Sequence, residues 1–385
     1  MKKTLQFLSL SVIVLFSCKE NIQENTTPES LKIETNRKMD STPKNIILMI
    51  GDGMGISQIT AGMYRNGNKL ELERCKVIGL IKTNSKKQLI TDSSAGATAF
   101  ATGKKTRNGM VSQAMEDSAN FKTFVEYAEE NKKATGIVVT STVTHATPAC
   151  FYAHYPRRYN ANEPISAQFI QSGVDVLIGG GKKYFETRTD ERNLLKELTD
   201  KGYTVLDTLT PQFDTKEIFQ LVYLYAPTQP GKLVFTKGDE APSRGPILPL
   251  ATEKAIDVLK KDSNGFFMLV EGSQIDWGGH NNDSEYIINE MLDFNLAIKK
   301  VLDFAEKDGE TLVIITADHE TGGYAIIDGK VDGSEIKGGF STEHHSAAMI
   351  PVFAFGKGAE NFAGIYDNTA VFDKMMDAFR IKKTE

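Results

Sequence analysis

The chain has 385 residues, of which 40 % are hydrophobic and 25 % are charged, an ordinary globular composition. This length suffices for one large α/β domain or two smaller ones. The formal net charge of −5 gives no electrostatic case for nucleic acid as a specific partner, and no segment after the N-terminus is apolar for long enough to span a membrane.

The N-terminal segment MKKTLQFLSLSVIVLFSC is typical of an export signal, with two lysines, an apolar run, a small residue and Cys18. Its LFSC ending resembles a lipobox, in which the cysteine is lipidated after cleavage. Phe16 is bulkier than the usual residue there, and an ordinary signal peptide with an incidental cysteine is the alternative. We expect a signal peptide at 1–18, a polar tether at 19–43 and the folded domain at 44–385, lipid-anchored in the periplasm or at the outer membrane.

Six apolar runs predict the buried strands of a mostly parallel sheet. Helical patterns at 120–133, 247–262 and 284–307 alternate with these runs, which is typical of βαβ units with helices on both faces of the sheet. The stretch 182–245 is less regular, and we interpret it as an accessory insertion at the sheet edge. The predicted strands are 45–51, 135–141, 174–180, 265–272, 311–317 and 350–356.

Side chains of the kinds that bind metal ions follow several of the predicted strands. Asp52 follows the first strand, Glu271 closes the fourth and is followed by GSQIDWGGH, and ADHETGG follows the fifth. Ligands of open α/β sheets bind beyond the carboxyl ends of the strands. A single Asp there is more often a turn residue or a helix cap, but four such sites at strand ends are hard to explain as caps. Carboxylates with imidazoles suit zinc, and an all-oxygen cluster suits magnesium. The candidate ligands are Asp52, Glu271, Asp276, His280, Asp318, His319 and His345.

The stretch TDSSAGATAFATGKK at 91–105 places Asp92 directly before Ser93 in a run of small and hydroxyl residues. A helix that packs closely on the sheet would explain the alanines but not the acidic residue before the serine. A helix starting at Ser94 would direct its N–H groups and its dipole toward a phosphate. A serine hydroxyl is a poor nucleophile and needs a base or a metal to activate it.

Six motifs occur in the order found in alkaline phosphatases, and DSSAGAT is a highly specific nucleophile signature. The match spans residues 45–356, most of the mature chain, so the sequence resembles bacterial alkaline phosphatases. The motifs are IGDGMG, TDSSAGATAFATG, THATPACFYAHYPRR, VEGSQIDWGGH, TADHETGG and STEHHS.

The resemblance implies a role for each matching position. Ser93 would be the nucleophile, and Arg158 would hold two phosphate oxygens with its planar fork. The cofactors would be two Zn²⁺ and one Mg²⁺ per chain, the zinc ions about 4 Å apart. The implied ligands are Asp52, Asp318 and His319 for the zinc at the nucleophile, Asp276, His280 and His345 for the second zinc, and Asp52, Thr147 and Glu271 for magnesium.

Two implied assignments have adjacent rivals. The family spacing favours His345 over His344, and the spacing from Thr147 favours Arg158 over Arg157. The chain also departs from the best-known bacterial members, which carry Asp and Lys where this sequence has His145 and Trp277. These departures leave the occupant of the magnesium site open.

Cys75 and Cys150 do not make a disulfide framework. They could pair in an oxidising compartment, or each could be a buried thiol, because both lie in apolar surroundings.

The implied function is hydrolysis of phosphate monoesters by an exported metal-dependent enzyme through a phosphoserine intermediate. A phosphodiesterase of the same superfamily is the nearest alternative, although it would be expected to lack the phosphate-clamping arginine. A sulfatase needs a C/S-x-P-x-R context that does not surround Ser93. A catalytically dead zinc-binding surface protein would not need the complete residue set. The family commonly forms homodimers, but no motif marks an interface.

Overall fold

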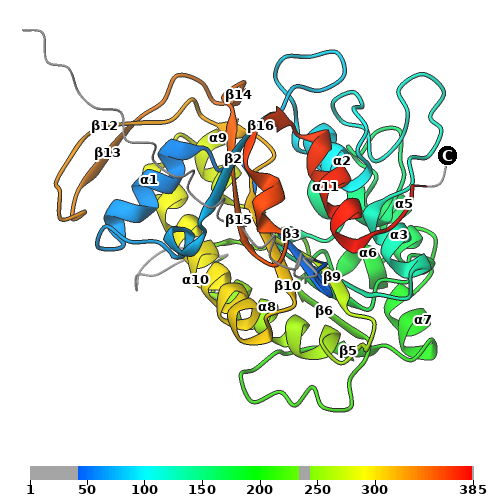
Figure 1. Ribbon diagram of the computed structural model, residues 1–385. Helices are drawn as coiled ribbons and strands as arrows, with labels where there is room; N and C mark the ends of the chain where they lie inside the picture. Colours follow the sequence, from blue (N-terminus) through cyan, green and yellow to red (C-terminus); the bar gives the residue numbers. More distant parts are fainter. Residues whose placement is uncertain (1–41, 234–242, 384–385) are drawn as a thin grey trace, which may run out of the picture. The chain divides into compact units, whose positions relative to one another are not determined.

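A ten-stranded sheet organises the part of the chain that the computed structural model describes, residues 42–233 and 243–383 (Figure 1). The expected signal peptide, Cys18 and nearly all of the tether lie outside the described residues. From one edge to the other, the strands are β16 (Gly364–Asp367), β2 (Val77–Lys82), β15 (Ile350–Gly356), β10 (Thr311–Thr316), β1 (Asn45–Gly51), β9 (Phe266–Gly272), β3 (Ala134–Thr142), β4 (Val176–Gly180), β6 (Leu221–Ala226) and β5 (Thr204–Leu206).

The sheet is mostly parallel, as predicted. Among its described pairings, β15 runs antiparallel to both β10 and β2, and the others are parallel. The expectation that 350–356 is one more parallel strand was therefore wrong. An apolar run shows that a strand is buried but not its direction. The chain returns from β10 through short strands rather than through a crossover helix, which allows an antiparallel neighbour.

Helices cover both faces of the sheet (Figure 1). On β9, Phe267 packs against Phe124 and Phe151, with ring centroids 4.7 and 5.9 Å away, while Phe266 packs against Phe304 at 6.0 Å. Because successive strand residues point to opposite faces, these contacts place the two helix layers on either side. One layer contains α1 (Ile56–Arg65), α8 (Ile247–Leu259) and α10 (Ser284–Asp308); the other contains α2 (Ser93–Thr102), α3 (Phe124–Glu130), α4 (Ala146–Tyr152) and α11 (Thr369–Phe379).

The stretch 182–245 contributes to the main sheet. Its strands β6 and β5 extend the sheet beyond β4, and β6 has the apolar sequence LVYLYA. The six strands predicted from apolar runs did not include β6, and they did not include β2 and β16 at the opposite edge of the sheet. The same stretch also supplies α6 (Lys183–Glu186), α7 (Leu194–Asp200), β7 (Lys232–Leu233) and β8 (Ser243–Arg244).

The carboxyl ends of the central strands lie side by side. Ile50 near the end of β1 pairs with Thr316 on β10 and with Glu271 on β9, and Glu271 pairs with Val139 on β3. The loops after these strands therefore start at one edge of the sheet, which is where the sequence predicts the functional side chains.

Two further features bear on the sequence predictions. Cys75 and Cys150 are both buried free thiols, so they do not pair in this structure. Among the described residues, no helix combines the length and the apolar character needed to cross a membrane.

Candidate active site

Asp92 fixes the start of helix α2 and the place of Ser93. Its Oδ1 accepts a hydrogen bond from the backbone N–H of Ala95 at 2.9 Å, and its Oδ2 accepts one from Gly109 at 2.8 Å. Asp92 is therefore the N-cap, and the helix begins at Ser93, one residue earlier than the expected start at Ser94. The nucleophile candidate thus occupies the first turn, where unpaired N–H groups and the helix dipole favour an anion.

Helix α2 also packs directly on the residues after β10. A Cβ at Gly96 would lie 3.0 Å from the Cβ of Asp318, so only a glycine leaves this approach unstrained. The approach places the Oγ of Ser93 3.3 Å from Nε2 of His319. The side chain expected to attack phosphorus therefore contacts a predicted metal ligand.

Asp52, Asp318 and His319 form a fully buried group beside Ser93. His319 Nε2 lies 3.2 Å from Asp318 Oδ2 and 3.5 Å from Asp52 Oδ1. Burial first, and then repulsion from neighbouring carboxylates, raises the pKa of Asp318 to about 8 and that of Asp52 well above its ordinary value. Both oxygens of Asp52 and Oδ2 of Asp318 have no hydrogen-bond partner among the described residues. Such oxygens, next to an imidazole, fit a zinc ion.

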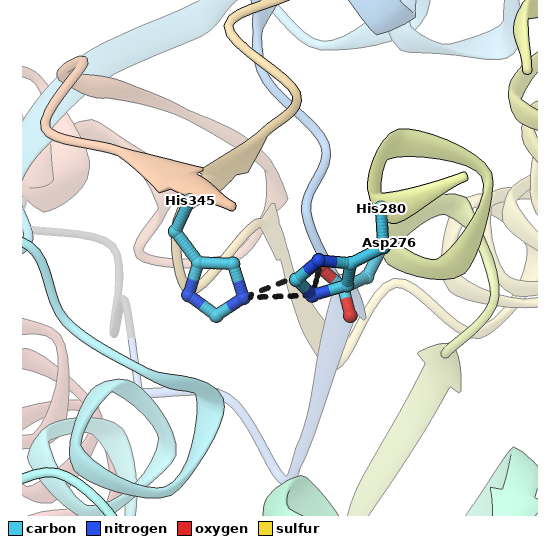
Figure 2. A group of neighbouring side chains, drawn as sticks. All are labelled: Asp276, His280 and His345. Carbon is cyan, nitrogen blue, oxygen red and sulfur yellow. Dashed lines mark hydrogen bonds and ion pairs between the residues drawn. The ribbon is translucent and has the colours of Figure 1, made fainter. Parts of the chain in front are cut away.

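Asp276, His280 and His345 form a second group, shown in Figure 2. Asp276 Oδ1 lies 3.4 Å from His280 Nε2 and 3.5 Å from His345 Nε2, and the two Nε2 atoms are 3.1 Å apart. The Nδ1 atom of His280 lies 2.6 Å from the carbonyl of Glu343, and that of His345 lies 2.8 Å from the carbonyl of Thr91. A proton on each Nδ1 would satisfy these carbonyls and leave each Nε2 lone pair for a metal.

Short elements bring this second group together. Helix α9 (Ile275–His280) places Asp276 and His280 one turn apart on the same face. Strand β14 (His345–Ser346) pairs antiparallel with β11 (Glu320–Thr321), and the ring of His345 stacks on that of His319, with centroids 3.5 Å apart. His345 rather than the exposed His344 therefore lies in the group. The ribbon of β12 (Ala325–Gly329) and β13 (Ile336–Gly339) connects the two short strands.

Thr321 contacts one residue of each predicted zinc-binding group, and the sequence motifs did not predict this role. Its Oγ1 lies 2.5 Å from Oδ1 of Asp276 and 3.2 Å from Nδ1 of His319. Thr321 is fully buried, and a threonine two residues after a DH pair carries no ligand signal of its own. Only the pairing of β11 with β14 and the packing of α9 reveal this role.

Glu271 and Thr147 are the other two residues predicted for an oxygen-rich site, and both are buried. Glu271 Oε2 accepts a hydrogen bond from Ser273 at 2.6 Å, and burial raises the pKa of Glu271 to about 7. Glu271 also contributes to the raised pKa of Asp52. Glu271 Oε1 and Thr147 Oγ1 have no hydrogen-bond partner among the described residues, so the donor set fits a hard cation.

Arg158 is brought to Ser93 through Asp92. Its Nε lies 3.9 Å from Asp92 Oδ2, and its backbone N–H donates to the carbonyl of Gly109 at 2.9 Å. The neighbouring Arg157 is exposed. The structure thus places Arg158, and not its rival, against the residue that caps the nucleophile helix.

His145 and Trp277 lie together near these groups, with ring centroids 5.9 Å apart in an edge-to-face arrangement. Burial first, and then the charge of Arg158, lowers the pKa of His145 to about 3, so its imidazole is neutral. Its buried Nδ1 has no hydrogen-bond partner among the described residues.

Comparisons with known proteins agree with this geometry. A family model described as alkaline phosphatase matches residues 43–338. Alkaline phosphatase 3 of Bacillus subtilis is 33 % identical over 98 % of this chain and 97 % of its own length, and the Escherichia coli alkaline phosphatase is 31 % identical over 89 % and 87 %. The solved alkaline phosphatase of the Antarctic bacterium TAB5 is 43 % identical, with a TM-score of 0.81 over 89 % of this chain and 99 % of that one. The chain therefore belongs to the alkaline phosphatase family, as a phosphatase of the bacterial type.

Proposed function

We propose that this phosphomonoesterase acts through a phosphoserine intermediate on Ser93, at a centre that holds two Zn²⁺ and one Mg²⁺. The observation that carries the proposal is the contact of Ser93 Oγ with His319 Nε2 at 3.3 Å, at the N-terminus of α2. A serine in that place lies between His319, a side chain suited to bind zinc, and a helix N-terminus suited to bind phosphate.

The residues that would hold the metals are the buried carboxylates, the imidazoles and the threonine hydroxyl at this edge of the sheet. Asp52, Asp318 and His319 would bind one zinc, and a second would bind to Asp276, His280 and His345. Asp52 would also bind magnesium with Glu271 and Thr147. When bound, such ions lower the pKa of a hydroxyl or a water, and they also offset the charge that develops on the oxygens whose bonds to phosphorus form and break. The orphaned oxygens of Asp52, Asp318, Glu271 and Thr147 support this assignment.

The chain's own residues then account for two in-line displacements. Ser93 Oγ forms a bond to phosphorus as the bond to the leaving oxygen breaks, and the alcohol departs. A water then attacks phosphorus, the bond to Ser93 Oγ breaks, and inorganic phosphate leaves with net retention at phosphorus. Throughout, the N-terminal N–H groups of α2 and the Arg158 fork hold the non-bridging oxygens.

The position of Arg158 favours a monoesterase over a diesterase of the same superfamily. A monoester dianion offers two non-bridging oxygens to a guanidinium, whereas a diester has one of its oxygens esterified and carries less charge. Rates on a monoester, a diester and a sulfate ester, with metal content determined on the same sample, test the proposal. We expect high monoester turnover in a sample with zinc and magnesium; a faster diester or sulfate reaction would contradict it.

We also propose that the enzyme is exported and acylated at Cys18, with 19–43 as tether. This rests on the LFSC ending, and stable anchoring takes more than one acyl chain. Mass spectrometry of the mature N-terminus should find a lipidated Cys18, and a free N-terminus beyond it would contradict the anchor.

A further inference from the structure

We propose that Tyr159 is a positioning residue that holds the guanidinium of Arg158 ready for phosphate. The inference rests on the proposed role of Arg158 as the phosphate clamp. It adds a residue that the sequence motifs did not single out.

The guanidinium of Arg158 lies over the ring of Tyr159. The guanidinium carbon of Arg158 lies 4.5 Å from the centroid of the Tyr159 ring, well within the range of a cation–π interaction. Arg158 Nε has no hydrogen-bond partner among the described residues, and its distance of 3.9 Å to Asp92 is longer than a hydrogen bond. Among the described residues, the Tyr159 ring is the aromatic partner of this guanidinium, and Asp92, without a hydrogen bond to Nε, adds charge attraction.

The backbone of Gly109 lies close to the Tyr159 ring. Gly109 has a φ of +80°, and a Cβ there would lie 3.1 Å from Cε2 of the ring. The same glycine accepts the backbone hydrogen bond of Arg158 and donates its own N–H to Asp92. The glycine thus links the ring, the arginine and the cap of α2 in one arrangement.

A cation–π contact suits a phosphate clamp because the ring interacts with the delocalised charge of the guanidinium. Phosphate oxygens bind the N–H groups at the edge of the guanidinium, so the two interactions are compatible. Tyr159 can therefore hold Arg158 before and after phosphate binds. An arginine held in this way loses less rotamer freedom on binding. The Tyr159 residue itself is 51 % exposed, so it adds little to the core, and its loss should not unfold the protein.

The test compares Tyr159→Ala, Tyr159→Leu and Tyr159→Phe with the unaltered enzyme. We expect Tyr159→Ala to lower kcat/KM by about threefold to tenfold, the size of one cation–π contact, on aryl and alkyl monoesters alike. The inhibition constant of inorganic phosphate should rise by a similar factor, while zinc content stays unchanged. Tyr159→Phe should retain near-normal values because the ring remains, and Tyr159→Leu should resemble Tyr159→Ala.

A matched control is Phe219→Ala. Phe219 is another exposed aromatic residue with a cation, Lys261, 5.1 Å from its ring, but it precedes the amino end of β6, at the opposite edge of the sheet from Ser93. Its replacement should leave kcat/KM and phosphate inhibition unchanged.

A double-mutant cycle separates this inference from a general structural effect. In an Arg158→Ala background, Tyr159→Ala should have no further effect on either parameter. An undiminished effect in that background, or a loss confined to aryl monoesters, would overturn the positioning role. Unchanged kcat/KM and phosphate inhibition in Tyr159→Ala, together with a loss in Arg158→Ala, would also overturn it. A wild-type enzyme without monoesterase activity or phosphate on Ser93 would instead refute the proposed function.

Discussion

The rings of His280 and His345 are each fixed by a backbone carbonyl at Nδ1, while both Nε2 atoms approach Asp276. The identities of these residues could be predicted from the order and spacing of the motifs. The fixed orientations of the rings could not be predicted in this way. The ring of His280 depends on the carbonyl of Glu343 and that of His345 on the carbonyl of Thr91, and each partner is distant in the sequence. Thr321 was missed for the same reason, since its role depends on the pairing of β11 with β14.

His345 and His344 offer a direct test of which histidine is the ligand. His345→Ala should lower zinc content and activity, because it removes one of the converging Nε2 atoms. His344→Ala should leave zinc content unchanged, because that side chain is exposed. Metal analysis of both purified variants is the measurement. If His344→Ala alone loses zinc, the assignment is wrong by one residue.

Arg158 should distinguish monoesters from diesters. Each charge-assisted hydrogen bond contributes on the order of 1.5–3 kcal/mol, so Arg158→Ala should reduce kcat/KM for a monoester by about one to three orders of magnitude. The loss on a diester should be much smaller. Arg158→Lys should not restore the full rate, since an ammonium lacks the planar fork.

Arg157→Ala is the control for this prediction, because its side chain is exposed and should contribute little. Equal losses on monoesters and diesters for Arg158→Ala, or a larger monoester loss for Arg157→Ala, would refute the assignment.

At the scale of elements, the close approach of α2 to the residues after β10 builds the nucleophile site. The sequence predicted the existence of this helix and the central parallel strands, because apolar runs and small residues are local signals. It placed the helix start one residue late, because the cap depends on a side-chain contact of Asp92. It also misjudged the direction of β15, which depends on the connection rather than on the composition of the strand.

Gly96→Ala tests the close approach. Alanine favours a helix by roughly 0.5–1 kcal/mol over glycine, but its Cβ would lie 3.0 Å from the Cβ of Asp318. We expect activity and zinc affinity to fall although the melting temperature changes little. Gly245→Ala is the control, because its Cβ would meet nothing within 4 Å. Full activity in Gly96→Ala would show that the helix need not approach so closely.

At the scale of the whole molecule, the three central strands β1, β9 and β10 bring several carboxylates into one buried place, which is unfavourable without cations. Burial is the largest cause of the raised pKa values of Asp318, about 8, and Glu271, about 7. In the unfolded chain these groups titrate near 4. Through these two carboxyl groups, the metal-free folded state binds more protons than the unfolded chain between about pH 4 and pH 8, and this contribution lowers its stability as the pH rises through this range.

Metal ions replace those protons, so the loaded enzyme should lack this part of the pH dependence. We expect the difference in melting temperature between metal-loaded and chelated protein to grow from pH 5 to pH 8. Taking the difference removes groups that titrate alike in both forms, such as Glu129, whose burial raises its pKa to about 8. Melting curves at matched ionic strength check this. A difference that stays constant or shrinks with rising pH would be inconsistent with buried carboxylates as the ligands.

In the proposed mechanism, Ser93 carries the phosphoryl group during turnover. The most direct measurement is to quench the working enzyme at low pH with a labelled phosphate monoester and to map the label by peptide mass spectrometry. We expect covalent phosphate on Ser93, and neither label nor appreciable activity in Ser93→Ala. Among the described residues of the first turn of α2, Ser93 is the one whose hydroxyl contacts His319. Label on Ser94, or an active enzyme that traps no phosphate, would contradict this expectation.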